Sequence, residues 1–144
     1  IYDDTERDFN GGYHPVDYSK PLGNITVRRA IESSQNIPFV EIMQELKPSV
    51  SMDYLERLGI TTLTEEDNNL SLALGGLQKG ISPLEMAAAY AAIANDGQYI
   101  EPVFYQNIKN HSGETIITPK QALSTLSKNF LSTLNFILHL FFLY

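Results

Sequence analysis

The chain of 144 residues has the size of one ordinary domain, with 43% apolar and 19% charged residues. Its net charge of -7, with 10 Lys and Arg residues that form no cluster, argues against a nucleic-acid or anionic-membrane surface. The absence of cysteine excludes disulfides, zinc ribbons and thiol proteases. The chain starts at Ile1 without a recognisable targeting signal, so we expect a piece of a longer protein.

An irregular lead-in covers residues 1–25, where Gly, Pro, Asn and Asp break every hydrophobic period. Five of its residues imitate the spacing of a calcium-binding EF-hand loop: Glu6, Asp8, Asn10, Gly11 and Asp17. The first and last ligand types are exchanged relative to that pattern, and Pro21 prevents the helix that should follow. We therefore interpret the segment as a solvated acidic loop.

Two predicted helices meet within residues 33–38, Ser-Ser-Gln-Asn-Ile-Pro. Thr26 is a favourable N-cap for the first, and Ser34 continues its apolar face. This helix should end near Asn36, because a proline disfavours helix in the residue before it and starts the next helix well. The second helix should bury Phe39, Val40, Met43 and Leu46.

The side chains of Ser34 and Asn36 have two interpretations. By local chemistry they are a helix terminus and cap, where Ser and Asn are favoured. A hydroxyl and a carboxamide two residues apart can also relay a proton and hold an amide carbonyl, provided that a base lies nearby. His14, His111 and His139 are isolated in the sequence, which argues against zinc or histidine-base chemistry.

The middle of the chain is predicted to be short helix, loop and strand. Pro48 should close the second helix, Ser51 should cap a third that ends at Gly59, and a polar loop should follow over residues 60–69. The alternation in Leu70–Leu74 predicts a short strand before a glycine-rich crossing.

The helix that begins at Ser82 has the clearest signals. Ser82 and Glu85 form a capping box around a proline at the first helical position, and the alanine-rich body predicts a central helix. Val103–Lys109 and Glu114–Thr118 then predict a hairpin across residues 110–113.

Residues 130–144 form an apolar run that is shorter than the roughly 20 residues needed to span a bilayer. They fit a core helix, an interfacial helix or sequence read in the wrong frame, and we favour the last.

Three stretches together resemble the transpeptidase domain of class A penicillin-binding proteins. They begin at Tyr13 (Y-x-P through G-x-I-T-V-R), at Ala30 (A-I-x-S-S-Q-N-I-P) and at Leu74 (L-G-G-x-x-x-G-I-S-P-L-E-M-A-x-A-Y). The resemblance covers residues 1–124, with Asp17 at a position where the family commonly has Asn. Residues 125–144 depart from the family pattern, which continues with a helix near Leu123, and a frameshift or premature stop is our hypothesis for them.

The resemblance implies an α+β fold: the mainly helical portion of an incomplete penicillin-binding protein or serine β-lactamase-like transpeptidase, with a β-hairpin near its C-terminal side. In that family the acylation site uses S-x-x-K, S-x-N and K-T-G motifs. Ser34-Gln35-Asn36 matches the second, which implies that Ser34 relays protons and that Asn36 holds the first lysine and a substrate amide, with Gln35 at the variable position. The first and third motifs are absent from the chain, so we expect the nucleophile and the K-T-G motif outside it.

The resemblance therefore implies a fragment of a peptidoglycan D,D-transpeptidase that crosslinks stem peptides through an acyl-serine intermediate, binds β-lactams and is inactive alone. The alternative is a noncatalytic remnant or an interaction-only product of an interrupted gene. No cofactor or metal is implied, and other cell-wall synthesis proteins are candidate partners. The full-length family implies an extracytoplasmic, membrane-associated location, with membrane anchoring outside this fragment.

Overall fold

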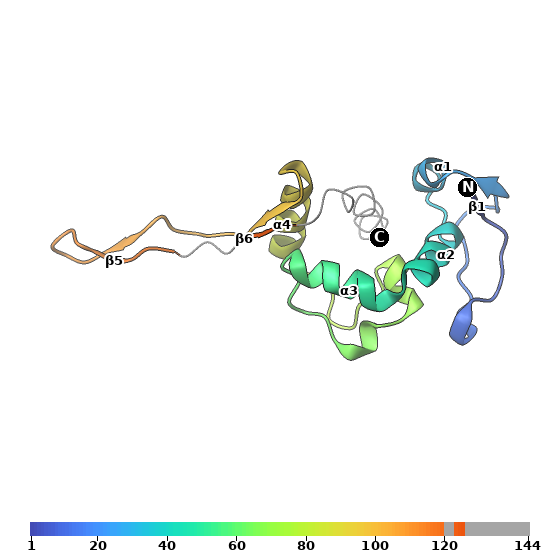
Figure 1. The fold of residues 1–144 in the computed structure, drawn as a ribbon, viewed down its shortest axis with the longest axis horizontal. Helices are drawn as coiled ribbons and strands as arrows, with labels where there is room; N and C mark the ends of the chain where they lie inside the picture. Colours follow the sequence, from blue (N-terminus) through green and yellow to red (C-terminus); the bar gives the residue numbers. More distant parts are fainter. Residues whose placement is uncertain (120–122, 126–144) are drawn as a thin grey trace.

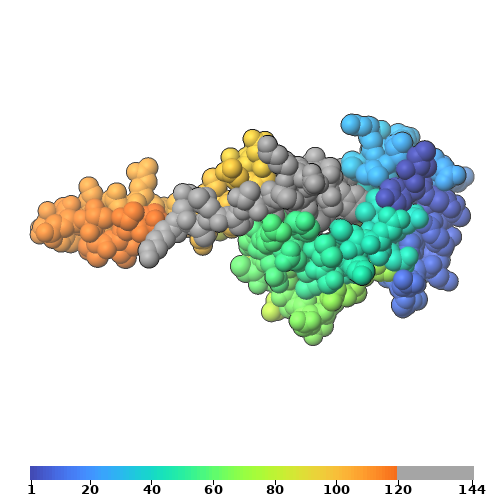
Figure 2. Space-filling model, in the orientation of Figure 1, coloured from blue at the N-terminus to red at the C-terminus, as the bar shows by residue number. Residues whose placement is uncertain are grey.

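The computed structural model describes residues 1–119 and 123–125. This part has the predicted α+β composition, with α-helices α1 to α4 and small antiparallel sheets of two strands each. The helices form the body of the molecule, and residues 103–118 extend from it as a long arm (Figures 1 and 2).

Two short strands that the sequence did not reveal close the base of the irregular lead-in. Strand β1 (Tyr2–Asp3) pairs antiparallel with β2 (Asn24–Ile25). Between them lies one 3-10 turn, η1 (Asn10–Gly12). Phe9 and Ile25 are buried in the core, so the loop is anchored by apolar packing as well as by backbone pairing.

Helix α1 (Val27–Glu32) begins as predicted, because the Thr26 side chain accepts the N–H of Arg29. The prediction that Ser34 continues its buried face was wrong. The helix ends at Glu32, and Ser34 lies beyond it with a left-handed φ of 57°.

Helix α2 (Ile37–Leu46) buries Phe39, Val40 and Met43, and its Leu46 is half-buried, as the apolar period predicted.

Helix α3 (Pro48–Arg57) starts earlier than predicted, because a proline fits the first turn of a helix. Ser51 is therefore not a cap. It lies inside α3, with its buried Oγ 3.2 Å from Met43 Sδ. Gly59 follows the helix with φ 82°, as expected for a helix end.

The strand predicted at Leu70–Leu74 is instead a 3-10 helix, η3, which follows the short 3-10 turn η2 (Glu65–Asp67). The Asn69 side chain starts η3 by accepting the N–H of Ser71 at 2.8 Å. Leu72 and Ala73 are both buried, whereas consecutive strand residues point to opposite faces. Packing of η3 against α2 explains this choice.

Helix α4 (Pro83–Ala94) has the predicted capping box between Ser82 and Glu85. Strand β3 (Gln98–Ile100) follows it and pairs antiparallel with β6 (Leu123–Thr125). Neither strand was predicted, and β6 occupies the position where the family resemblance implied the start of a helix.

The predicted hairpin is confirmed, although its strands are shorter than expected. Strand β4 (Ile108–Lys109) pairs with β5 (Thr115–Ile117) across the predicted turn. The predicted apolar run at residues 130–144 lies outside the described residues, as does all of the predicted 125–144 tail except Thr125.

The core lies where α2, α3 and η3 meet. Its largest fully buried apolar side chains come from these elements and the turn after α3: Phe39, Ile37, Met43, Leu55, Leu58, Leu72 and Val40. Helix α4 adds Ala89 and Ala92, whereas Ala87, Ala91 and Ala94 are exposed. In the described part, α4 is therefore covered on one face, not surrounded as its composition predicted. The helix junction rests on this core, because Ile37 is buried in it.

Candidate functional site

The junction between α1 and α2 is a Schellman helix end. The N–H of Ser34 donates to Ile31 O at 3.1 Å, and the N–H of Gln35 donates to Ala30 O at 3.0 Å. This pattern requires a left-handed residue, and here a serine takes that position instead of glycine. A left-handed residue other than glycine costs on the order of 1–3 kcal/mol and is found most often at functional sites. Lys47 and Asp96 also have left-handed φ values, of 74° and 51°, and among these three residues Ser34 is the one that lies in the S-x-N match.

Gln35 is the most firmly held residue of the junction, and its side chain is fully buried. Its Oε1 accepts the hydroxyl of Ser19 at 2.6 Å, and its Nε2 donates to Asp4 Oδ2 at 2.5 Å and to Lys20 O at 3.2 Å. Gln35, at the variable position of the S-x-N motif, thus connects the junction to Asp4 and to Ser19 and Lys20 of the lead-in.

Asn36 is also buried, at 6% exposure, and is held through both backbone and side chain. Its N–H and that of Ile37 donate to Asp17 Oδ1. Its Nδ2 donates to Val16 O at 2.7 Å. Asp17 therefore caps α2 from a distant loop, and the neighbouring residue Val16 fixes the carboxamide.

The junction also contains an unusual carboxyl pair, because Asp4 is fully buried and Asp17 is 8% exposed. Burial raises the pKa of Asp17 to about 6, and the charge and hydrogen bond of Asp4 add to this rise. The N–H groups of Asn36 and Ile37 act in the opposite direction and do not cancel it.

The structure brings Ser34 and Asn36 together at one helix junction, as the motif spacing required. The hydroxyl of Ser34 makes no hydrogen bond to the described residues, which leaves it available to a further group. Sequence reasoning missed the role of Gln35 and the pairing of Asp4 with Asp17. The departure from the family pattern at Asp17 was the one signal that could have found that pair.

The calcium-loop imitation in the lead-in has a different explanation. Asp17, at the last position of the imitated pattern, is buried and accepts from the start of α2, so the interpretation as a solvated loop was wrong at this residue. Asp8 Oδ1 lies 2.9 Å from His14 Nδ1. Within residues 1–119 and 123–125, no group of three His, Cys, Asp or Glu side chains is arranged to hold a metal ion.

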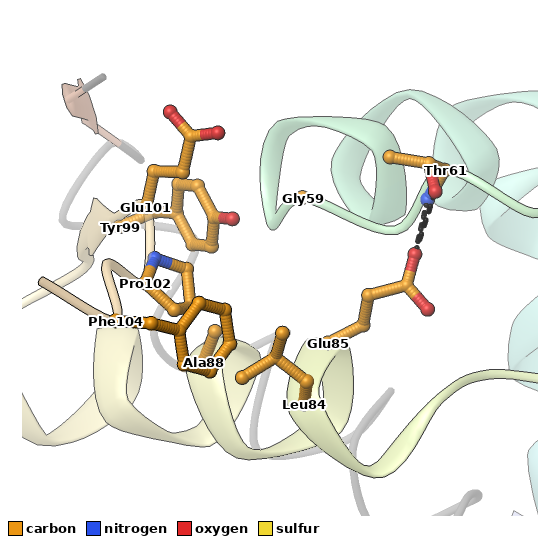
Figure 3. A pocket seen from close by; sticks show the side chains of 9 residues that line it. All are labelled: Gly59, Thr61, Leu84, Glu85, Ala88, Tyr99, Glu101, Pro102 and Phe104. Atoms are coloured by element: carbon orange, nitrogen blue, oxygen red, sulfur yellow. Dashed lines mark hydrogen bonds between the residues drawn. The ribbon is translucent and has the colours of Figure 1, made fainter. Parts of the chain in front are cut away.

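A separate pocket of about 370 Å³ lies beside α4 (Figure 3). Its residues come from the chain after α3, from α4, from β3 and from the chain after β3: Gly59, Thr61, Leu84, Glu85, Ala88, Tyr99, Glu101, Pro102 and Phe104. Glu85 accepts the N–H and hydroxyl of Thr61 at 2.9 and 2.8 Å. None of the junction residues lines this pocket.

Comparison with known families decides the identity of the chain. The family model of the penicillin-binding protein transpeptidase domain matches residues 2–139. The chain belongs to the penicillin-binding protein transpeptidase family. This confirms the resemblance drawn from the three sequence stretches. The match passes the boundary expected at residue 124, and the proposed division of the chain there remains a prediction.

The chain is similar to penicillin-binding protein 1F of Bacillus subtilis, with 40% identity over 112 residues. The match covers 77% of the chain and 15% of that relative, so the chain spans a small part of its relative's length. Its fold is similar to penicillin-binding protein 1A of Haemophilus influenzae, with a TM-score of 0.67, 24% identity, and coverage of 86% and 19% of the two chains.

A second structural neighbour is the D,D-transpeptidase domain of a peptidoglycan glycosyltransferase from Eggerthella lenta. The TM-score is 0.61 at 18% identity, with coverage of 88% of this chain and 39% of the neighbour. In the described part of the chain, no helix is both long and apolar enough to cross a membrane.

Proposed function

We propose that this chain is a segment of a peptidoglycan D,D-transpeptidase, with Ser34-Gln35-Asn36 as its S-x-N motif. The observation that carries the proposal is the geometry of the junction. Ser34 is held in a left-handed conformation with its hydroxyl unused by the described residues. Two residues further on, the backbone N–H of Asn36 donates to Asp17 and its carboxamide donates to Val16 O. Membership of the transpeptidase family supports the same assignment.

In this proposal Ser34 relays a proton and Asn36 binds the substrate amide. A serine from outside these 144 residues attacks the amide carbonyl of a stem peptide, its proton leaves through basic groups, and the departing amine receives a proton as the C–N bond breaks. Asn36 has one N–H of its carboxamide bound to Val16 O, which fixes the plane of the group. A fixed amide plane suits the orientation of a substrate carbonyl.

The chain alone should be inactive, since it contains no S-x-x-K and no K-T-G motif. We expect no labelling of the purified chain by a fluorescent penicillin, measured on a denaturing gel. Stoichiometric labelling would contradict this part of the proposal.

The roles of Ser34 and Asn36 can be tested in a complete relative. Residues 26–46 of this chain would replace the equivalent segment of penicillin-binding protein 1F of Bacillus subtilis. Ser34→Ala and Asn36→Ala should each lower the acylation rate by about 100-fold, the usual size of one proton-transfer or positioning effect. Ser33→Ala is the matched control and should change the rate less than about 3-fold. Equal rates for all three variants would refute the assignment.

We further propose that the full-length protein is extracytoplasmic and membrane-associated. Its proposed ligands are stem peptides and β-lactams, and its proposed protein partners are other cell-wall synthesis proteins.

The alternative is a noncatalytic product that offers only an interaction surface. One observation favours this alternative, namely the apolar side chains of the arm, where Phe104 is 82% and Ile116 62% exposed. Met86 and Tyr90 of α4 are half-buried and add little to such a surface. A chain that sediments as a monomer would count against the alternative.

A further inference from the structure

We propose that Asp4 and Asp17 share one proton as a buried carboxyl pair, and that this proton keeps Asn36 in place at the junction. The two residues are positioning residues, because neither belongs to the S-x-N motif itself. The importance of Asn36 rests on the proposed function, whereas the shared proton does not.

Each carboxylate has one oxygen that is well satisfied. Asp4 Oδ2 accepts the N–H of Leu22 at 2.8 Å and Nε2 of Gln35 at 2.5 Å. Asp17 Oδ1 accepts the N–H groups of Asn36 and Ile37. These four donors fix both side chains, so the carboxyl groups cannot turn away from each other without losing hydrogen bonds.

The other two oxygens, Asp4 Oδ1 and Asp17 Oδ2, are buried and have no hydrogen-bond partner in the described residues. Two ionised carboxylates cannot bond to each other, because both are acceptors only. One proton converts this contact into an O–H···O⁻ hydrogen bond and removes one of two like charges. The side chains of Asp4 and Asp17 lie close enough for a hydrogen bond between them, so a single proton corrects both defects of the pair.

The surrounding charges offer no substitute for this proton. Lys20 reaches the cluster through its backbone carbonyl, which accepts from Gln35, and Asp3 bonds to Thr5. Arg29 pairs with Glu32, and Glu41 of α2 pairs with Arg7. Arg28 is exposed on α1. Within the described part of the chain, no cationic side chain lies within ion-pair distance of either carboxylate.

Loss of the proton should loosen Asn36 in particular. Repulsion between the two carboxylates acts on Asp17, and Asp17 carries the contact to the backbone N–H of Asn36. Val16, whose carbonyl holds the Asn36 carboxamide, is the residue directly before it. Both restraints on Asn36 thus come from one short stretch of loop, and both weaken when that stretch shifts.

A pH titration of the isotope-labelled 144-residue chain by NMR tests the proposal without any catalytic activity. We expect the side-chain carboxyl carbon of Asp17 to titrate about two pH units above an exposed Asp. The backbone amide shifts of Asn36 and Ile37 should follow the same midpoint. Asp17→Asn should abolish this transition, because the amide donates permanently to Asp4, and Asp4→Asn should lower the midpoint by about 1 unit or more.

Asp8→Asn is the matched control, because Asp8 lies in the same lead-in with an 81% exposed side chain. It should leave the transition at Asn36 unchanged. The proposal is overturned if Asp17 titrates with the exposed aspartates, or if the Asn36 and Ile37 amides do not follow it. The wild-type titration alone decides this even where a variant does not fold. A negative acylation experiment in the chimera would refute the proposed function and leave this result standing.

Discussion

Two carboxylates in this chain each hold the start of a helix, and their pKa values shift in opposite directions. Asp17 accepts two backbone N–H groups at the start of α2, yet its pKa rises from 3.8 to about 6. Glu85 accepts from Thr61 and Ser82 at the start of α4, and its pKa falls from 4.5 to about 2.

The difference lies in the surroundings of the two side chains. Glu85 receives backbone and hydroxyl hydrogen bonds from both partners, with the backbone N–H of Thr61 as the largest cause of its lowered pKa and burial as the smallest influence. Asp17 is buried beside a second carboxyl group, and burial is the largest cause of its raised pKa. Hydrogen bonds from the N–H groups at a helix start thus keep a carboxylate ionised only if the carboxylate stays hydrated and no second negative charge lies beside it. The same capping contact is a permanent anchor at α4 and a proton-dependent one at the candidate site.

The largest expected effect comes from removing the residue that connects the buried network. Gln35→Ala removes one of the two donors to the buried Asp4 Oδ2, takes the Gln35 partner from the Ser19 hydroxyl and from Lys20 O, and creates a small cavity. Unsatisfied buried polar groups cost roughly 1–3 kcal/mol each, so we expect the free energy of unfolding to fall by about 3 kcal/mol at neutral pH. Urea denaturation followed by circular dichroism measures this change.

Gln78→Ala is the control for that substitution, because the side chain of Gln78 is exposed. Its backbone N–H, which donates to Asp67 Oδ1 at 2.8 Å, is retained in the variant. We expect a change below about 0.5 kcal/mol for this surface site. Similar losses for the two variants would show that Gln35 has no special role in the network.

The sequence predicted the elements whose signals are local. The capping box of α4, the Thr26 cap of α1 and the hairpin turn each depend on residues within a few positions of one another. The family resemblance likewise proposed Ser34 and Asn36 as site residues, because the motif is contiguous, and their roles remain predictions. These features could be read from the sequence without knowledge of distant contacts.

The features that the sequence did not reveal depend on contacts between distant residues. Leu70–Leu74 has a strand-like alternation, but packing against α2 makes it a 3-10 helix. The partner of Asp17 is Asp4, which lies outside any local pattern, and the partner of Gln35 is the same residue. No periodicity reports that two acidic side chains will be buried together, so the carboxyl pair was visible only in the fold.

The second expected effect is a loss of stability as the pH rises. The pKa of Asp17 is raised in the folded chain, so its contribution is fully present below 3.8 and is lost as the pH rises through about 6. Between about pH 4.5 and pH 7 the free energy of unfolding should therefore fall, by at most about 3 kcal/mol for a shift of this size. Asp17→Asn should abolish this slope, measured by urea denaturation at several pH values. A wild-type curve parallel to that of Asp17→Asn would contradict the shared proton.

The smallest expected effect concerns Glu85, whose pH dependence has the opposite sign. Its lowered pKa means that its contribution is present above 4.5 and is lost as the pH falls through about 2. Glu85→Gln keeps the shape and one acceptor but loses the charge, so we expect a loss of about 1 kcal/mol at neutral pH, the usual size of an N-terminal cap. The difference from wild type should shrink as the pH falls through about 2, because the Glu85 side chain then becomes neutral like the glutamine amide. Glu56→Gln, at an exposed position of α3, is the control and should show no such convergence.

Because the two carboxylates act in opposite directions, wild-type stability should be highest near pH 4 to 5, between the titrations of Glu85 and Asp17. A maximum at neutral pH would show that Asp17 does not act against Glu85 in this way.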